Sequence, residues 1–140
     1  MSLEANKELV RRYIEEVHNQ GKMEVLDEVL DPHFAVLSLA GRMEVGIEQM
    51  KAFSTYRRAA IPDFHVVIDE VIAECDKVVV RGHESGTQVG EYGFGEMFHF
   101  PPSGKRFTVS WIDIYTIANG KIVDMWAEMD IDAMKRQLAP

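Results

Sequence analysis

The sequence has little or none of several features that define whole classes of protein. Its one cysteine, Cys75, cannot form a disulfide within the chain, so we expect a reducing, cytoplasmic setting. Lysine and arginine never form a block longer than two residues, and the net charge is −8. Because phosphate binding needs a concentrated basic face, a nucleic acid is not an expected partner. No apolar run approaches the ~20 residues of a membrane span and no signal-peptide pattern opens the chain, so a membrane is not expected either.

Motifs for cofactors and covalent catalysis are also missing. The histidines show no metal-ligand spacing; they are His18, His33, His65, His83 and His99. No glycine-rich phosphate loop follows a predicted strand, and neither a serine nor Cys75 has an evident base beside it. We therefore expect no metal and no cofactor, and any catalysis would use the acids and bases of the chain itself.

What the chain does contain is the material for one α+β domain over residues 1–140. A composition of 46% hydrophobic and 27% charged residues is that of an ordinary globular protein with a sizeable core. Helical apolar spacing predicts helices at Leu3–Gln20, Lys22–Leu30, Gly46–Ala60 and Asp130–Leu138. Alternation predicts strands at Phe34–Leu39, Phe64–Glu74 and Lys77–Gln88, and a hairpin over Lys105–Met129. The long aromatic-rich loop at Val89–Gly104 can cover the mouth of a pocket.

The hairpin over Lys105–Met129 is the most informative stretch. With a three-residue loop at 118–120, Ile117 pairs with Lys121 and the side chains divide into two faces. One face is apolar apart from a single carboxylate and comprises Phe107, Val109, Trp111, Asp113, Tyr115, Val123, Met125, Ala127 and Met129. The other face carries Thr108, Ser110, Ile112, Ile114, Thr116, Ile122, Asp124, Trp126 and Glu128. A two-residue turn would mix these sets, so the hydrophobic pattern favours the longer loop.

Asp113 is the polar exception on the apolar face. A carboxylate among Trp, Tyr, Phe and Met side chains is desolvated, which raises its pKa and suits it to proton transfer. The alternatives are a buried Asp113 satisfied by backbone or hydroxyl donors and an Asp113 at the wet rim of the sheet. Tyr13, the polar-tipped residue on the inner stripe of the first helix, either belongs to the core or lines the same pocket.

An ordered set of short motifs runs along nearly the whole chain. They are YIEEVHNQG at 13–21, Gly46 with its helix, IPDFH at 61–65, CDKVVVR at 75–81, Gly86-Thr87, PSGK at 102–105, and GKIV at 120–123 followed by Trp126. In this order they resemble the SnoaL-like, polyketide (ester) cyclase branch of the nuclear-transport-factor-2-like superfamily. The resemblance implies a cone: a curved, mainly antiparallel sheet wrapped around the N-terminal helices, with an apolar cavity at one end. It also implies a homodimer, commonly through the sheet, for which the face bearing Trp126 is suited.

Several positions depart from the pattern of those cyclases. In the family, acid–base work falls to a carboxylate directly after the Trp of the last strand, facing a His on the preceding strand. Here Ala127 follows Trp126 and the facing position is Asp113, so the carboxylate lies on the partner strand and the His is missing. The usual Gly-Thr-His also ends in Gln88. These departures leave Asp113 as the one matching position able to transfer protons.

Glu84 is the second candidate acid. Alternation places it on the same face as Gly82 and two valines of its strand. If that face points inward, Glu84 shares the pocket with Asp113, and one carboxyl can be protonated while the other is ionised. The simpler expectation is a surface ion pair between Glu84 and Arg81 or a neighbouring strand.

These observations favour a cofactor-free enzyme that acts on a small apolar carbonyl compound by removing a proton α to the carbonyl, with aldol ring closure or isomerisation as the outcome. The expected catalytic residues are Asp113 and Glu84, and the expected substrate-binding residues are Tyr13, Phe53, Val109, Trp111, Tyr115, Met125, Ala127 and Met129. Tyr13, Tyr115 or Trp111 would orient the substrate or donate to the developing oxyanion.

Two other functions remain open. A non-catalytic protein that binds a small apolar ligand is favoured by Ala127 and by the missing His. A hydrolase or isomerase using the same cavity would need a second polar group near Asp113.

Overall fold

The computed structural model describes residues 2–140 and begins with helical segments. Helix α1 (Leu3–Arg12) continues without a break as the π-helical segment η1 (Tyr13–Asn19), followed by the 3-10 turn η2 (Met23–Val25) and helix α2 (Leu26–Val29). The remaining elements are β1 (Leu30–Ser38), β2 (Gly41–Glu44), α3 (Gly46–Ala60), β3 (His65–Glu74), β4 (Lys77–Gln88), β5 (Tyr92–Phe94), β6 (Phe98–Phe100), β7 (Lys105–Ala118), β8 (Lys121–Met129) and α4 (Ile131–Leu138).

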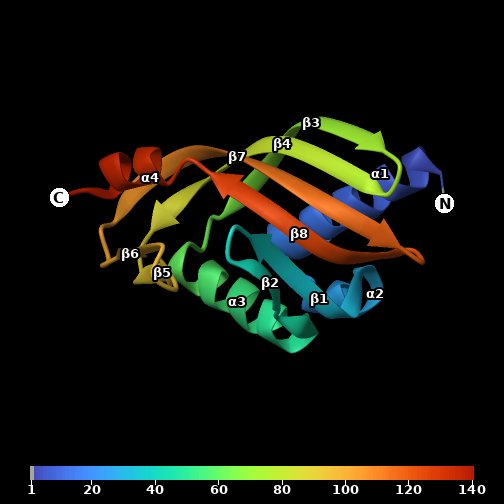
Figure 1. Cartoon of the computed structure of the whole chain (residues 1–140). Helices are drawn as coiled ribbons and strands as arrows, with labels where there is room; N and C mark the ends of the chain where they lie inside the picture. The colour runs from blue at the N-terminus through green and yellow to red at the C-terminus, as the bar shows by residue number, and fades with distance from the viewer. Residues whose placement is uncertain (1) are drawn as a thin grey trace.

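One curved, unclosed sheet carries most of the strands. Its order is β2-β1-β8-β7-β4-β3, and β1 runs parallel to β8 while the other neighbours are antiparallel. In Figure 1, α1 lies behind the sheet and α3 runs along the side formed by β1 and β2. The core lies between helices and sheet, where Tyr13 and Val17 are buried together with Val80 and Tyr115. This is the α+β cone that the sequence predicts.

The helices follow the sequence pattern, with one change of type. The helix predicted at Gly46–Ala60 is α3. The helix predicted at Leu3–Gln20 forms, but from Tyr13 onward it winds as a π-helix. The second predicted helix ends at Val29, because Leu30 already pairs with Ile122 as part of β1. Within residues 2–140, no helix has the length and apolar character needed to cross a bilayer.

Two short pieces of sheet were not predicted. All four residues of β2 are exposed, so no alternation of burial marks this strand in the sequence. The stretch predicted as a loop at Val89–Gly104 contains the hairpin β5–β6; its aromatic residues Tyr92, Phe98 and Phe100 are buried and fill the core, as expected for this loop. Gln88, which is fully buried, holds this segment: its amide Nε2 donates to the carbonyls of Gly90, Phe100 and Pro101 at 2.8 to 3.1 Å. The loop prediction is wrong because these contacts are not local in sequence.

The turn of the central hairpin also differs from the prediction. Ala118 pairs with Lys121, so the turn has two residues, Asn119 and Gly120, and both have positive φ. That geometry is favoured in tight hairpins because it matches the twist of the strands. The predicted three-residue loop and the Ile117–Lys121 pair are therefore wrong.

A β-bulge explains why the two predicted faces nevertheless form. The register shifts between the Ile117–Ile122 pair and the Thr116–Asp124 pair, so one extra residue restores the alternation beyond the turn. From there on, Asp113 pairs with Ala127 and Ile114 with Trp126, as the face assignment requires. Only residues between the turn and the bulge lie on a different face from the one predicted. Ile122 was predicted on the polar face and is fully buried.

Candidate active site

The inner face of β7 and β8 gathers most of the predicted site residues. Side chains two residues apart on a strand share a face, and the cross-strand register aligns Trp111 with Met129, Asp113 with Ala127 and Tyr115 with Met125. Val109 follows on the same face of β7 and is buried. Ala127 is exposed and Met125 and Met129 are partly exposed, so this side of the cone is less tightly packed than the part near Tyr115, which is fully buried.

Asp113 lies on this face as a partly buried carboxylate. The Tyr115 hydroxyl donates a hydrogen bond of 2.8 Å to its Oδ2 atom. Burial raises the pKa of Asp113 to about 7; the Tyr115 hydrogen bond and the charge of Arg57 act in the lowering direction, while Glu84 acts in the raising direction. Near neutral pH the carboxyl therefore exists in both protonation states, which is what a general base or acid requires.

Two buried tyrosines stand next to this carboxyl. Tyr13, from η1, packs edge-to-face against Tyr115 with ring centroids 6.0 Å apart. Burial raises the pKa of both hydroxyls above the ordinary value, so both remain neutral donors. Tyr13 also lies edge-on to His18, at 4.8 Å between centroids. These residues are five positions apart, a separation that shares a face in the π-helix of η1, in which each residue bonds to the fifth along.

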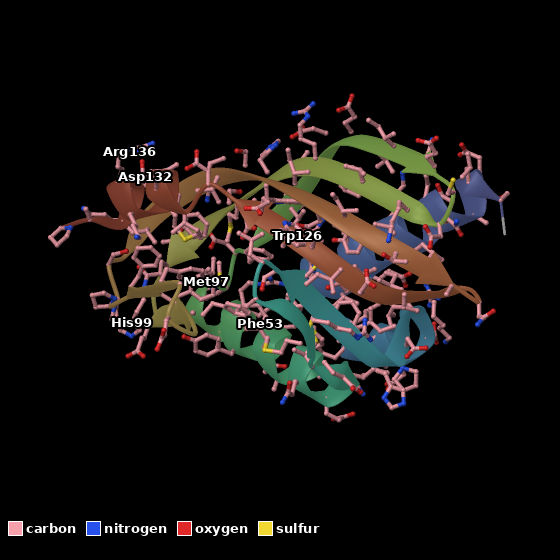
Figure 2. The ribbon with its side chains drawn as sticks, in the orientation of Figure 1. Phe53, Met97, His99, Trp126, Asp132 and Arg136 are labelled. Carbon is pink, nitrogen blue, oxygen red and sulfur yellow. The ribbon has the colours of Figure 1, made fainter. Side chains whose placement is uncertain are left out.

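Arg57 brings a positive charge to the same interior. One of its terminal nitrogens lies 2.8 Å from Nδ1 of His18, and its guanidinium stacks 4.3 Å from the Phe64 ring centroid and 5.3 Å from that of Phe53. Burial, assisted by Arg57, holds the pKa of His18 well below its ordinary value. His18 is thus neutral and accepts from the guanidinium, which has only donors. The predicted pocket residue Phe53, labelled in Figure 2, lies on α3. Its ring also packs edge-on against Phe94, with the centroids 5.2 Å apart.

Glu84 points inward, so the expected surface pair with Arg81 is wrong. Only 8% of Glu84 is exposed, whereas Arg81 lies on the outer face and pairs with Glu70 at 3.6 Å. Gly82 explains the arrangement: the Trp111 indole occupies the space in front of it, with Cζ2 2.8 Å from where a β-carbon would stand. Burial raises the pKa of Glu84, and Arg57 acts in the opposite direction. Strands β4 and β7 therefore bring both predicted acids to one face of the sheet.

Sequence reasoning missed two polar residues of this interior, His18 and Arg57, and considered Tyr92 only as part of an aromatic-rich loop that fills the core or shapes a ligand site. Tyr92 is buried on β5, and burial raises its pKa to about 12 while nearby Arg57 acts in the lowering direction. A signal for Arg57 was present, because it continues the helical stripe of Met50 and Phe53. His18 gave no such signal, because an α-helical period places it away from Tyr13. Among residues 2–140, no group of three or more His, Cys, Asp or Glu side chains could hold a metal ion.

The comparisons with known proteins agree with this architecture. The family model described as SnoaL-like polyketide cyclase matches residues 8–138. The structure of TsrD from Streptomyces laurentii is 32% identical, with a TM-score of 0.85, and the match covers 99% of this chain and 98% of that one. A structure described as a SnoaL-like polyketide cyclase from Jannaschia sp. CCS1 is 30% identical, with a TM-score of 0.82 and coverage of 98% and 94%.

A more distant neighbour shares the fold alone. AclR from Streptomyces galilaeus, described as a proposed hydroxylase, has a TM-score of 0.81 at 18% identity, over 98% of this chain and 86% of that one. The search of curated proteins found no match. The match of the family model to nearly the whole sequence, on a fold with this curved sheet and inner carboxyl, establishes that the chain belongs to the SnoaL-like polyketide cyclase family.

Proposed function

We propose that this protein is a cofactor-free enzyme in which Asp113 removes a proton α to the carbonyl of a small apolar compound. The observation that supports this proposal most is the state of Asp113: a carboxyl on an apolar face, hydrogen-bonded by Tyr115, with its pKa raised to about 7. A base whose pKa lies near the working pH is ionised in a large fraction of the molecules and still accepts a proton readily. Ring closure by an aldol step or isomerisation would follow from the carbanion so formed.

The other polar groups of the interior are assigned by their bonding. Tyr115 already donates to Asp113, so its role is to position and tune the base. The indole Nε1 of Trp111 is buried and has no acceptor among residues 2–140, which leaves it free to donate to the carbonyl oxygen as charge develops there. Glu84 is the second carboxyl of the same face, and its presence favours chemistry over simple ligand storage.

The family's acid–base pair is not reproduced in this chain. Ala127 stands opposite Asp113, so the position that would carry the carboxylate after Trp126 has no ionisable group. In our proposal one residue, Asp113, serves as base and then returns the proton. The rival function is a binder of small apolar molecules, which the apolar face around Asp113 would serve without the carboxyl being ionised.

Hydrogen–deuterium exchange tests the proposal without knowledge of the natural substrate. The α-protons of an apolar ketone such as 2-tetralone would be followed by NMR in D₂O with wild type, Asp113→Asn and Glu128→Gln, an exposed carboxylate on the outer face that serves as control. We expect Asp113→Asn to lower the exchange rate by roughly 10² to 10⁴-fold and the control to leave it unchanged. The wild-type rate should rise with pH through about 7 and then level, because the ionised carboxylate is the base.

Equal exchange rates for wild type and Asp113→Asn would reject the proposal. The same holds for a wild-type rate that merely follows the uncatalysed rate in buffer. In either case binding of the ketone, measured separately, would support the ligand-binding function.

A further inference from the structure

Arg57 is a partly buried cation for which the protein supplies no close anion. Every ion pair within 4.0 Å among residues 2–140 involves other residues, so no carboxylate stands against its guanidinium. Its guanidinium hydrogen-bonds to two neutral side chains, His18 at 2.8 Å and the Tyr92 hydroxyl, and its Nε atom is buried without a partner in the same residues. A desolvated charge in this state is costly unless an anion offsets it.

The guanidinium is held in place from three sides. Phe64 covers one side at 4.3 Å, Phe53 contacts it at 5.3 Å, and His18 fixes one terminal nitrogen at 2.8 Å. Arg57 thereby reaches the interior from α3 in a fixed orientation, and a preorganised guanidinium offers two parallel donors that match a carboxylate.

The charge of Arg57 also acts throughout the candidate site. It acts in the lowering direction on the pKa of Tyr13, Glu84, Tyr92 and Asp113, which places it within electrostatic reach of the groups that line the interior from η1, β4, β5 and β7. Glu84 and Asp113 are the carboxyls on which this charge acts, yet burial favours the neutral form of both and neither forms an ion pair with Arg57 within 4.0 Å.

We propose that Arg57, anchored by His18 and stacked on Phe64, is the binding site for a carboxylate on the substrate, so that the preferred ligand is an apolar skeleton bearing one acidic group. This inference rests on the proposed function only in requiring that the interior receives a small apolar molecule. The carboxylate would orient the molecule from the α3 side, while Asp113 approaches it from β7.

A matched pair of probes tests the inference: 2-naphthoate and its neutral analogue 2-naphthamide, titrated by calorimetry at pH 6, where the naphthoate is ionised and Asp113 is largely protonated. We expect wild type to bind the carboxylate about tenfold more tightly than the amide or better, the effect of one charge-assisted hydrogen-bonding pair. Arg57→Met, which keeps an unbranched apolar stem but removes the guanidinium, should remove this preference, and Arg57→Lys should retain part of it.

Arg58→Met is the control, because Arg58 is the next residue of α3 and also bonds to His18, but at the backbone carbonyl, 3.1 Å away, with its side chain against Gly21. It should keep the full preference. If wild type shows no preference for the carboxylate, or if Arg57→Met and Arg58→Met show the same preference, the inference is wrong.

A second variant covers the case in which Arg57→Met does not fold. Arg57→Gln, which keeps hydrogen-bond donors at this position but carries no charge, should lose most of the preference for naphthoate over naphthamide; a full preference in Arg57→Gln would overturn the inference. Asp113→Asn separates this result from the proposed function: it should abolish α-proton exchange but leave the carboxylate preference intact. If Asp113→Asn loses α-proton exchange while wild type shows no preference for naphthoate, the carboxylate site is rejected and the proposed function stands.

Discussion

The raised pKa of Asp113 suits the residue to proton transfer but lowers the stability of the folded protein when the carboxyl ionises. The carboxyl is neutral in the folded protein below about pH 7, whereas in the unfolded chain it ionises near ~3.9. Because the folded pKa is the higher one, the unfolded state binds fewer protons between these values, and stability falls as the pH rises through that window. Above about pH 7 both states are ionised and the penalty stays constant.

This sign gives a prediction for Asp113→Asn. Relative to wild type, the variant should gain roughly 2 kcal/mol of unfolding free energy between pH 5 and pH 8, after allowance for screening of a partly exposed group. Urea unfolding at several pH values measures the difference directly. Asp76→Asn, in the exposed β3–β4 turn, should show no comparable trend. A pH-independent loss of stability in Asp113→Asn would mean that Asp113 is an ionised, well-bonded structural residue.

At the scale of elements, the site depends on how closely β4 and β7 approach. Gly82 stands opposite Trp111, and the absence of a side chain there allows the indole to lie across β4. The same closeness involves β3, since a β-carbon at position 82 would collide with the carbonyl oxygen of Val67. Glycine in a strand interior usually weakens the strand, so its presence here is explained by this close approach.

Gly82→Ala should therefore lower stability by roughly 1–3 kcal/mol, because a backbone carbonyl cannot move aside as a flexible side chain can. It should also displace the Trp111 indole. In a Trp126→Phe background the remaining tryptophan fluorescence, excited at a wavelength that tyrosine does not absorb, reports Trp111 alone, since the chain has two tryptophans. Ser85→Ala, three residues along the same strand, is the control. If Gly82→Ala keeps the wild-type spectrum and stability, the space in front of position 82 accommodates a β-carbon and the explanation for this glycine is wrong.

The whole molecule presents an apolar outer surface on the sheet. Ile112 and Ile114 of β7 are 46% and 39% exposed, and Ile72 of β3 is 54% exposed. Trp126, labelled on β8 in Figure 2, belongs to the same face, where its Nε1 donates to Glu128 at 2.8 Å. Exposed apolar groups on one face commonly mark an interface. We propose that two copies associate through this face, as the family resemblance implies.

The proposal predicts that Ile114→Glu converts a dimer into a monomer. A charge at the centre of the face would have to be desolvated on association, which weakens binding by several orders of magnitude. Sedimentation velocity at micromolar concentration measures the change. Glu48→Lys, an exposed position on α3 away from the sheet face, should leave the assembly unaffected. A wild-type protein that sediments as a monomer would refute the proposal, and so would an Ile114→Glu variant that remains a dimer.

Local periodicity was enough to predict the class of fold and most of its elements. Helix α3 and strand β4 have the predicted bounds, because their apolar spacing and their breakers are local features. The face of β7 that carries Asp113 was predicted for the same reason: a strand alternates with a period of two, so an Asp among Phe107, Val109, Trp111 and Tyr115 must share their environment. The family resemblance supplied the curvature of the sheet.

Tertiary contacts decided everything that depends on partners distant in sequence. The tight turn at Asn119-Gly120 with its bulge, and the β5–β6 hairpin held by Gln88, are fixed by pairing and by non-local hydrogen bonds. Alternation grouped Glu84 with Gly82 and two valines, but the neighbouring strand decided that this face points inward: Glu84 is buried on the side where the Trp111 indole lies in front of Gly82. Arg57 and His18 meet although 39 positions separate them, since a guanidinium on a helix acquires its role only when the fold brings an acceptor and two aromatic rings around it.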